Sequence, residues 1–362
     1  MTARVAPGLL AILAACGRVG FAPLPDDAPP TGDGSLAQPS VQSGSTVIPA
    51  LGTSSEVALT PVDPAHSVLV FSVLAYADAA ADALVLGELV DARTLHFERA
   101  GTGIDVAVQW SVISWRDWSV QRGRKRLATD QLLATQSLMP VDFARSVPLL
   151  SMMVEGGPLD EDDKLRAYLD ANREELRVEL GKGNPDAITM AWQVVTLPTA
   201  RVYHRALGMT SGQVAFIDTD PRGAYDPARS FVASSTSAAG TPAAAAQQLS
   251  TQVQPDGSLA FTRREGTGEL LFDTYLVELP AARVQHIAAD FVDMQPTSTP
   301  LITSPDAAAF ALGGAGDTDR TDSASSSSAT GILQLGDASV NVVRSATAGA
   351  ARIPVQVIEL QR

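Results

Sequence analysis

The sequence predicts an all-β protein: a tandem array of four small antiparallel β-sandwich units behind a signal peptide and a flexible tether. The first observation is a pattern of about eighty residues that recurs four times and fills almost everything after residue 40. The second is that apolar residues within each unit alternate at period two or form short β-rich runs, which is typical of strands. Turns rich in Gly and Pro separate these runs, as in small sandwiches and barrels.

Three sequence marks keep the same register in the four units. An opening segment that begins with Val occupies residues 41–44, 120–123, 202–205 and 284–287. A second segment begins with Asp and occupies residues 63–67, 142–146, 226–230 and, in shortened form, 306–309. Its aspartates are expected to make a turn in which the carboxylate accepts backbone N–H groups two or three residues on, and they are Asp63, Asp142, Asp226 and Asp306.

The third mark closes each unit, at residues 110–115, 192–197, 274–279 and 355–360. In the first two units this apolar strand begins with Trp110 and Trp192, which we expect in the core of the repeat because their strand is apolar. The three marks place the units at residues 41–118, 119–199, 200–281 and 282–362.

Each unit is expected to hold about six strands: one near the opening segment, one after it, one after the Asp mark, the two of a hairpin and the closing strand. One segment, residues 165–180, is rich in strong helix formers and would be predicted as a helix from propensity alone. It aligns with residues 84–99, 249–263 and 331–344, and two of these carry turn signals in the middle, Pro255-Asp256-Gly257 and Gly336-Asp337. Since four copies should share one fold, we predict a β-hairpin here.

Residues 1–15 are organised like a secretion signal, with Arg4 followed by an apolar stretch too short for the about 20 residues that a membrane span needs. The stretch ends in Leu13-Ala14-Ala15-Cys16, which resembles the lipobox of bacterial lipoproteins. That resemblance implies a lipidated Cys16 as the mature N-terminus, a membrane partner through this anchor, and a place in the bacterial envelope at the outer membrane or cell surface. Cys16 is also the one cysteine in the sequence, so no internal disulfide can form. Residues 16–40 are rich in Pro, Asp and Gly and read as a flexible tether.

Composition and motifs exclude several functions. The net charge of −14 argues against binding a phosphate backbone, so no nucleic acid partner is expected. The sequence has no Gly-x-Ser-x-Gly and no His-Glu-x-x-His, and its paired glycines precede strands rather than helices. The histidines recur in register or exchange with Arg, which indicates strand positions rather than general bases; they are His66, His96, His204 and His286. We therefore expect no catalytic residues, cofactor or metal, and we interpret the acidic runs at 160–163, 218–226 and 317–322 as solvated loops, with calcium as the alternative.

The four units resemble the small β-sandwich repeats of bacterial and phage surface proteins, and more distantly the H-type lectin sandwich, whose six antiparallel strands also end in a Trp-bearing strand. The resemblance implies the fold class and no particular binding residue. The first hypothesis is a non-enzymatic, lipid-anchored surface protein that presents loops to a glycan or a surface protein. The second is a structural spacer of the envelope, and the third a hydrolase with its site between units.

The segments that differ most between units follow the third strand, at residues 75–82, 155–164, 238–248 and 313–330. Surface loops of this kind often carry binding, so they are the expected contact regions. Four weak sites on one chain would add through avidity, and a single excised unit would then bind less tightly than all four.

Overall fold

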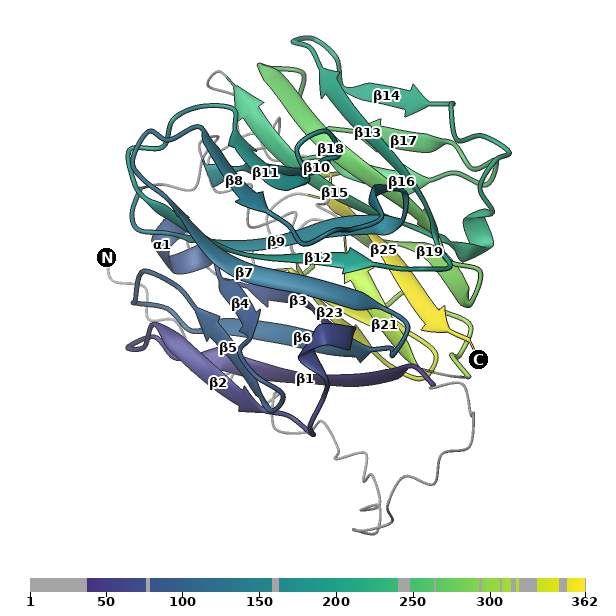
Figure 1. Cartoon of the computed structure of the whole chain (residues 1–362), viewed down its shortest axis with the longest axis horizontal. Helices are drawn as coiled ribbons and strands as arrows, with labels where there is room; N and C mark the ends of the chain where they lie inside the picture. Colours follow the sequence, from purple (N-terminus) through teal and green to yellow (C-terminus); the bar gives the residue numbers. More distant parts are fainter. Residues whose placement is uncertain are drawn as a thin grey trace. The chain divides into compact units, whose positions relative to one another are not determined.

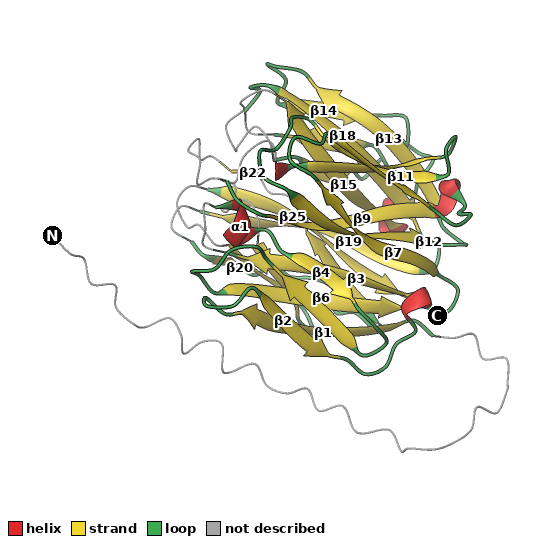
Figure 2. Cartoon of the chain, turned by 60° about the vertical axis from the view of Figure 1, so that its left-hand side comes forward, coloured by secondary structure: helices red, strands yellow, loops and turns green. Residues whose placement is uncertain are grey.

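The computed structural model describes residues 38–361 apart from 76–78, 158–162, 240–247, 264, 293–294, 307, 314–316, 319–330 and 345–349. Strands dominate these residues, with only short helical turns between them (Figure 2). The predicted all-β repeat architecture is confirmed. Residues 37–362 form one compact unit that contains all four repeats.

Each repeat has the strand order expected from the sequence (Figure 1). Repeat 1 holds β1 (Ser40–Ile48), β2 (Ser54–Ala58), β3 (Ser67–Leu74), β4 (Leu86–Leu89), β5 (Thr94–Glu98) and β6 (Val106–Ser114), with α1 (Ala80–Ala83) before β4. Repeat 2 holds β7 (Ser119–Leu127), β8 (Leu133–Ser137), β9 (Ser146–Val154), β10 (Leu165–Asp170), β11 (Glu175–Leu180) and β12 (Ile188–Thr196).

Repeats 3 and 4 follow the same plan. Repeat 3 holds β13 (Arg201–Met209), β14 (Ala215–Asp218), β15 (Ser230–Ala239), β16 (Ser250–Val253), β17 (Leu259–Thr262) and β18 (Glu269–Glu278). Repeat 4 holds β19 (Ala282–Phe291), β20 (Thr297–Ser298), β21 (Ala309–Gly313), the short β22 (Asp317–Thr318), β23 (Gly331–Leu335), β24 (Val340–Arg344) and β25 (Ala351–Leu360). Each set lies within the range expected for its unit, apart from Ser40.

Every repeat is a sandwich of two antiparallel sheets. The first sheet places the closing strand between the opening strand and the third strand, in the orders β1-β6-β3, β7-β12-β9, β13-β18-β15 and β19-β25-β21. The second sheet joins the short second strand to the hairpin, in the orders β2-β5-β4, β8-β11-β10, β14-β17-β16 and β20-β24-β23. The apolar closing strand is therefore central, and most of its side chains are buried in repeats 2, 3 and 4, whereas those of β6 alternate mainly between buried and half-buried.

The hairpin prediction for residues 165–180 is confirmed. Strands β10 and β11 pair antiparallel from Leu165 opposite Leu180 to Asp170 opposite Glu175. Every second side chain of both strands is buried, so the period-two apolar pattern outweighs the helix propensity of the intervening Arg and Glu. The turn is closed by Glu174, whose φ of 54° lies in the left-handed region.

The Gln of the opening mark joins the first sheet to the chain that follows the second strand. The side-chain amide of Gln42 donates to Thr60 O and accepts from Thr60 N, at 2.9 and 3.0 Å. Gln121 binds Met139 and Gln285 binds Thr303 in the same two-way manner. An amide can replace a backbone partner in this way because it offers one donor and one acceptor side by side.

The Asp mark begins a one-turn 3₁₀ helix in three repeats. The carboxylates of Asp63, Asp142 and Asp226 accept from the backbone N–H two residues on, at 2.9, 3.1 and 3.0 Å. The N–H of Asp306 donates to Glu359, as that of Asp226 donates to Glu278, and the residue after Asp306 lies outside the described residues. The turn leads directly into the third strand, so the mark sets where that strand begins.

Trp110 and Trp192 are both buried, with exposed fractions of 7% and 6%, in the cores of repeats 1 and 2. Each lies opposite a glycine of the opening strand, Gly44 and Gly123. A Cβ atom at either glycine would lie 2.6 or 2.7 Å from the indole ring, so a larger residue does not fit. In repeats 3 and 4 the larger residue stands on the opening strand and the smaller one on the closing strand, with Arg205 opposite Thr274 and Ile287 opposite Val355.

The repeats contact one another in a closed series. The hairpin of each repeat packs on the first sheet of the next: β4 on β9 and β12, β10 on β15 and β18, and β16 on β25. Strand β23 of repeat 4 packs on β3 and β6 of repeat 1, which returns the series to its start. No hairpin is left unpaired at an end, as it would be in an open array.

Candidate binding cavity

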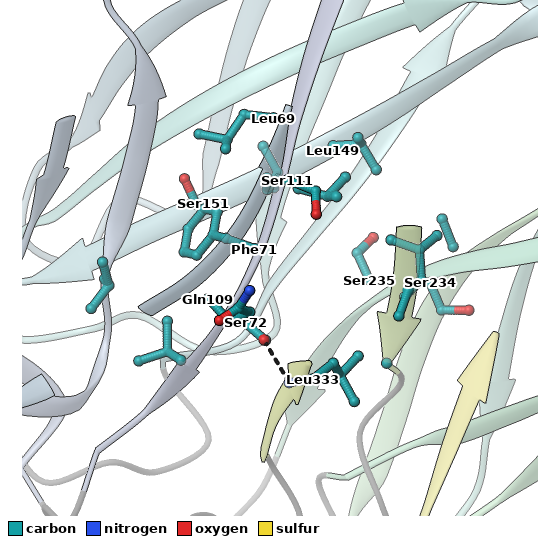
Figure 3. A pocket seen from close by; sticks show the side chains of 18 of the residues that line it. Leu69, Phe71, Ser72, Gln109, Ser111, Leu149, Ser151, Ser234, Ser235 and Leu333 are labelled. Atoms are coloured by element: carbon teal, nitrogen blue, oxygen red, sulfur yellow. Dashed lines mark hydrogen bonds between the residues drawn. The ribbon is translucent and has the colours of Figure 1, made fainter. Parts of the chain in front are cut away.

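A cavity of about 780 Å³ lies where the four repeats meet. Its wall is built mainly from the third strands, through residues 69–73, 148–152, 232–236 and 311–313 (Figure 3). This volume falls within the range of small-molecule sites in proteins, about 300 to 1,000 Å³. Because every repeat supplies one wall strand, the cavity exists only when the four repeats are assembled.

A shared core lies at one end of these strands. The second residue of each third strand packs there beside its partner on the closing strand. The four pairs are Val68 with Ile113, Val147 with Val195, Phe231 with Val277, and Phe310 with Ile358. The N-terminal ends of the third strands are thus joined by apolar packing, and the cavity lies between their later residues.

Serines at one repeated position fasten neighbouring repeats around the cavity. Ser151 of β9 accepts from Gly87 N and donates to Gly87 O, at 3.0 and 3.2 Å. Ser235 of β15 binds Ala167 of the preceding repeat in the same way, at 2.9 and 3.2 Å. Ser72 of β3 accepts from Leu333 N at 3.1 Å and so connects repeat 1 to repeat 4 (Figure 3).

Glutamines on two of the closing strands also join neighbouring repeats. Gln193 binds both Leu69 N and Leu69 O, at 3.0 and 2.8 Å, and so joins repeats 1 and 2. Gln356 binds Val232 in the same way and joins repeats 3 and 4. In repeat 2, the third-strand position of Leu69 and Val232 is occupied by Pro148, which has no N–H that needs a partner. In repeat 3, the closing-strand position of Gln193 and Gln356 is occupied by Tyr275.

Most polar side chains that face the cavity are therefore already bonded within the protein. Ser43 bonds Ser111 at 2.7 Å, and Ser234 bonds Thr274 at 3.0 Å. Tyr275 accepts from Leu169 N through its hydroxyl oxygen, and burial raises its pKa above the ordinary value. The remaining lining is largely apolar, with Leu69, Phe71, Leu149 and Leu333 among its members (Figure 3).

Lys164 is the one Lys, Arg, Asp or Glu side chain among the described residues that line the cavity. It stands just before β10, and its ammonium makes no ion pair within 4.0 Å with a described carboxylate. Burial lowers the pKa of Lys164 below the ordinary lysine value, and the nearby Asp163 opposes this shift. The Asp163 carboxylate is directed to Asn184, which donates to it at 2.9 Å, and Asp163 does not line the cavity.

The segments that the sequence singled out for binding lie partly outside the described residues, through 76–78, 158–162, 240–247, 314–316 and 319–330. The described ends of the segments can be placed, and several line the cavity: Ala75 in repeat 1, with Ala83 just after the segment, Lys164 in repeat 2, Gln248 in repeat 3 and Gly313 in repeat 4. All four segments thus connect to the chain at the cavity, away from the shared core.

The histidines serve contacts between strands and repeats. Nε2 of His204 lies 2.6 Å from the fully buried Asp273, and the ring stacks on Tyr275. Arg166 of repeat 2 lies 3.4 Å from the other oxygen of that carboxylate. Nε2 of His286 bonds Pro227 O at 3.0 Å, and burial lowers the pKa of this imidazole.

The acidic runs do not assemble a metal site in the part of the chain that the structure describes. No group of three or more His, Cys, Asp or Glu side chains is placed there to hold a metal ion. Within the run at 218–226, Asp218 accepts from the Tyr203 hydroxyl and Asp220 pairs with Arg205. Asp160, Asp319 and Asp322 lie outside the described residues, as does the expected lipidation site Cys16.

Sequence reasoning missed a buried arginine that recurs at the end of the hairpin. Arg99, Arg263 and Arg344 are at most 2% exposed, and each donates to backbone carbonyls of the turn between the first two strands. The signal was present, because these arginines end three of the four aligned segments. Leu180 occupies the position in repeat 2, where its N–H bonds Leu132 O just as that of Arg99 bonds Thr53 O.

Comparisons with known proteins leave the architecture as the main guide to function. No protein-family model matches the chain, and no curated protein matches its sequence. Among the described residues, no helix has the length and apolar character needed to cross a bilayer.

Proposed function

We propose that this chain is a non-enzymatic, lipid-anchored protein of the bacterial envelope whose four repeats act together as one binding body for a glycan or a surface protein. The observation that carries the proposal is the convergence of the four variable segments on one cavity, since a described end residue of each segment lines its wall. A scaffold that keeps its strands constant while these segments differ is typical of recognition proteins.

The closed series of contacts changes the expected mode of binding. Four independent sites would act through avidity, but segments that attach around one cavity can contact a single partner together. An excised repeat would expose the sheet face that the preceding hairpin covers, so binding has to be tested on the intact body.

The anchor is tested through Cys16. We expect the mature protein to begin with a diacylglyceryl cysteine at this position and to fractionate with membranes, and Cys16→Ser to release it into the soluble fraction. Mass spectrometry of the N-terminal peptide checks the modification. A wild-type protein that keeps residues upstream of 16 and remains soluble would refute lipid anchoring.

The binding proposal is tested with residues 37–362 on arrays of envelope polysaccharides and on intact cells. Replacement of residues 240–247 by Gly and Ser, at equal length, is expected to weaken binding at least tenfold. The control replaces Arg116 and Asp117, which are exposed in the connection between β6 and β7, at the shared-core end of the strands. Equal loss in both variants would count against a site at the variable segments, and no binding by the wild type would favour the spacer alternative.

A further inference from the structure

The cavity itself carries a separate inference, which does not depend on what the outer segments bind. Three properties define its chemistry: its volume, the state of its polar groups and the one charged side chain among the described residues that line it. A volume of about 780 Å³ is large enough to hold a small organic molecule.

The polar groups argue against a sugar as the ligand of the cavity. A sugar needs several protein donors and acceptors that are free to bond its hydroxyl groups, because unmatched hydroxyl groups cost free energy when buried. Here the serines at 72, 151 and 235 bond backbone atoms in the hairpin of the preceding repeat of the closed series, and Gln193 and Gln356 bond both N–H and C=O of a neighbouring strand. To a ligand, the wall therefore presents mainly apolar surface.

The side chain of Lys164 adds one polar feature that a ligand of this cavity would have to match. Lys164 is the basic side chain at this wall, and Asp163, the described carboxylate that raises its pKa, does not line the cavity. Burial disfavours a charged amine, which is why the pKa of Lys164 is lowered, and an anion placed beside it would stabilise the charged form. The amide of Gln109 and the hydroxyl of Thr236 also line the cavity and make no hydrogen bond to another described side chain or backbone group, so both can donate to an anion.

We propose that the cavity between the four third strands binds an amphipathic anion, an apolar molecule with one acidic group, whose acidic group pairs with Lys164. A fatty acid is the simplest member of this class. The apolar part would displace water from the leucines and Phe71, so each additional buried methylene would strengthen binding.

The experiment uses residues 37–362 and two fluorescent probes that differ in one group. 1-Anilinonaphthalene-8-sulfonate carries an anion on an apolar ring system, and N-phenyl-1-naphthylamine has the same ring system without the sulfonate. We expect the wild type to bind the sulfonate at least tenfold more tightly, and dodecanoate to displace it more effectively than methyl dodecanoate. Lys164→Met should lower affinity for the sulfonate about tenfold and leave the neutral probe unchanged.

Two further variants separate the site from general effects. Lys182→Met removes the same charge from an exposed position in the turn before β12 and should change neither affinity. Leu149→Trp, or Val70→Phe if the first variant folds poorly, fills the cavity and should weaken both probes. Circular dichroism and the melting temperature confirm that each variant is folded.

Several outcomes would overturn the inference. Equal affinity of the wild type for both probes, or no binding of either, would exclude an amphipathic anion. An unchanged sulfonate affinity in Lys164→Met would show that Lys164 is neutralised by other groups of the chain. Binding that survives both filling variants would place the probes elsewhere.

Discussion

Replacing Gly123 by isoleucine is expected to lower the free energy of unfolding by about 3 kcal/mol, because its Cβ atom would lie 2.7 Å from the Trp192 ring. Replacing Trp192 by valine removes most of a buried indole and is expected to cost about 3 to 5 kcal/mol. The two residues face each other on paired strands, so their effects should not add.

The double variant Gly123→Ile with Trp192→Val reproduces the pair that repeat 4 carries, Ile287 opposite Val355. We expect it to be more stable than the sum of the single effects by about 2 kcal/mol, because isoleucine fills the space that the indole leaves. Denaturant titrations followed by circular dichroism and by fluorescence measure the three free energies.

Gly208→Ile serves as the control for inserting isoleucine into an opening strand. Gly208 lies in β13, and an added Cβ atom would meet the flexible end of Leu271 at 3.1 Å. Isoleucine favours strands, so we expect a change within about 1 kcal/mol. Strictly additive effects of the substitutions at 123 and 192 would show that the two positions are not coupled.

The repeat marks could be understood from sequence because each one makes hydrogen bonds or packing contacts within its own repeat. Asp63 bonds a backbone N–H two residues on, and Gln42 bonds the chain after the second strand of the same repeat. These contacts recur in each unit, so the residues that make them repeat in the sequence with the period of the unit. The hairpin at 165–180 could be predicted for the same reason, since the sandwich requires a hairpin there in every copy.

The closure of the series could not be predicted in this way. It is held by serine hydroxyls and by glutamines that bond backbone atoms of another repeat, as Ser151 does with Gly87. A backbone partner can carry any side chain, so the sequence holds no complementary residue to detect. The cavity and the position of Lys164 follow from closure and were therefore equally hidden, although Gln193, Tyr275 and Gln356 already share one repeat position.

The buried arginine shows what the repeats demand beyond apolar packing. Arg99 is 1% exposed, and its Nη2 donates to Pro49 O, Gly52 O and Ile104 O at 3.0, 3.1 and 2.6 Å. One guanidinium thereby satisfies carbonyls of two different loops, and hydrogen bonds to a charged donor are worth about 1.5 to 3 kcal/mol each. Burying this charge is tolerated because these carbonyls surround it.

Arg99→Leu is expected to lower the free energy of unfolding by about 3 to 5 kcal/mol, since the three carbonyl oxygens would lose their common donor. Denaturant titration of residues 37–362 measures the loss. Arg93→Leu makes the same change at an exposed position of the same hairpin and should stay within about 0.5 kcal/mol of the wild type.

The fold accepts leucine at this position in another repeat, so the test is stringent. Repeat 2 carries Leu180 there, 7% exposed in the core of that repeat, and holds its turn by another route: Asp130, with φ of 59°, donates its N–H to Asn184 O at 2.8 Å. Repeat 1 joins the same two loops by the reverse bond, from Gly103 N–H to Ala50 O at 2.6 Å, and adds the carbonyl bonds of Arg99. If Arg99→Leu unfolds with the wild-type free energy, apolar packing alone supports this turn and the three carbonyl bonds contribute nothing net.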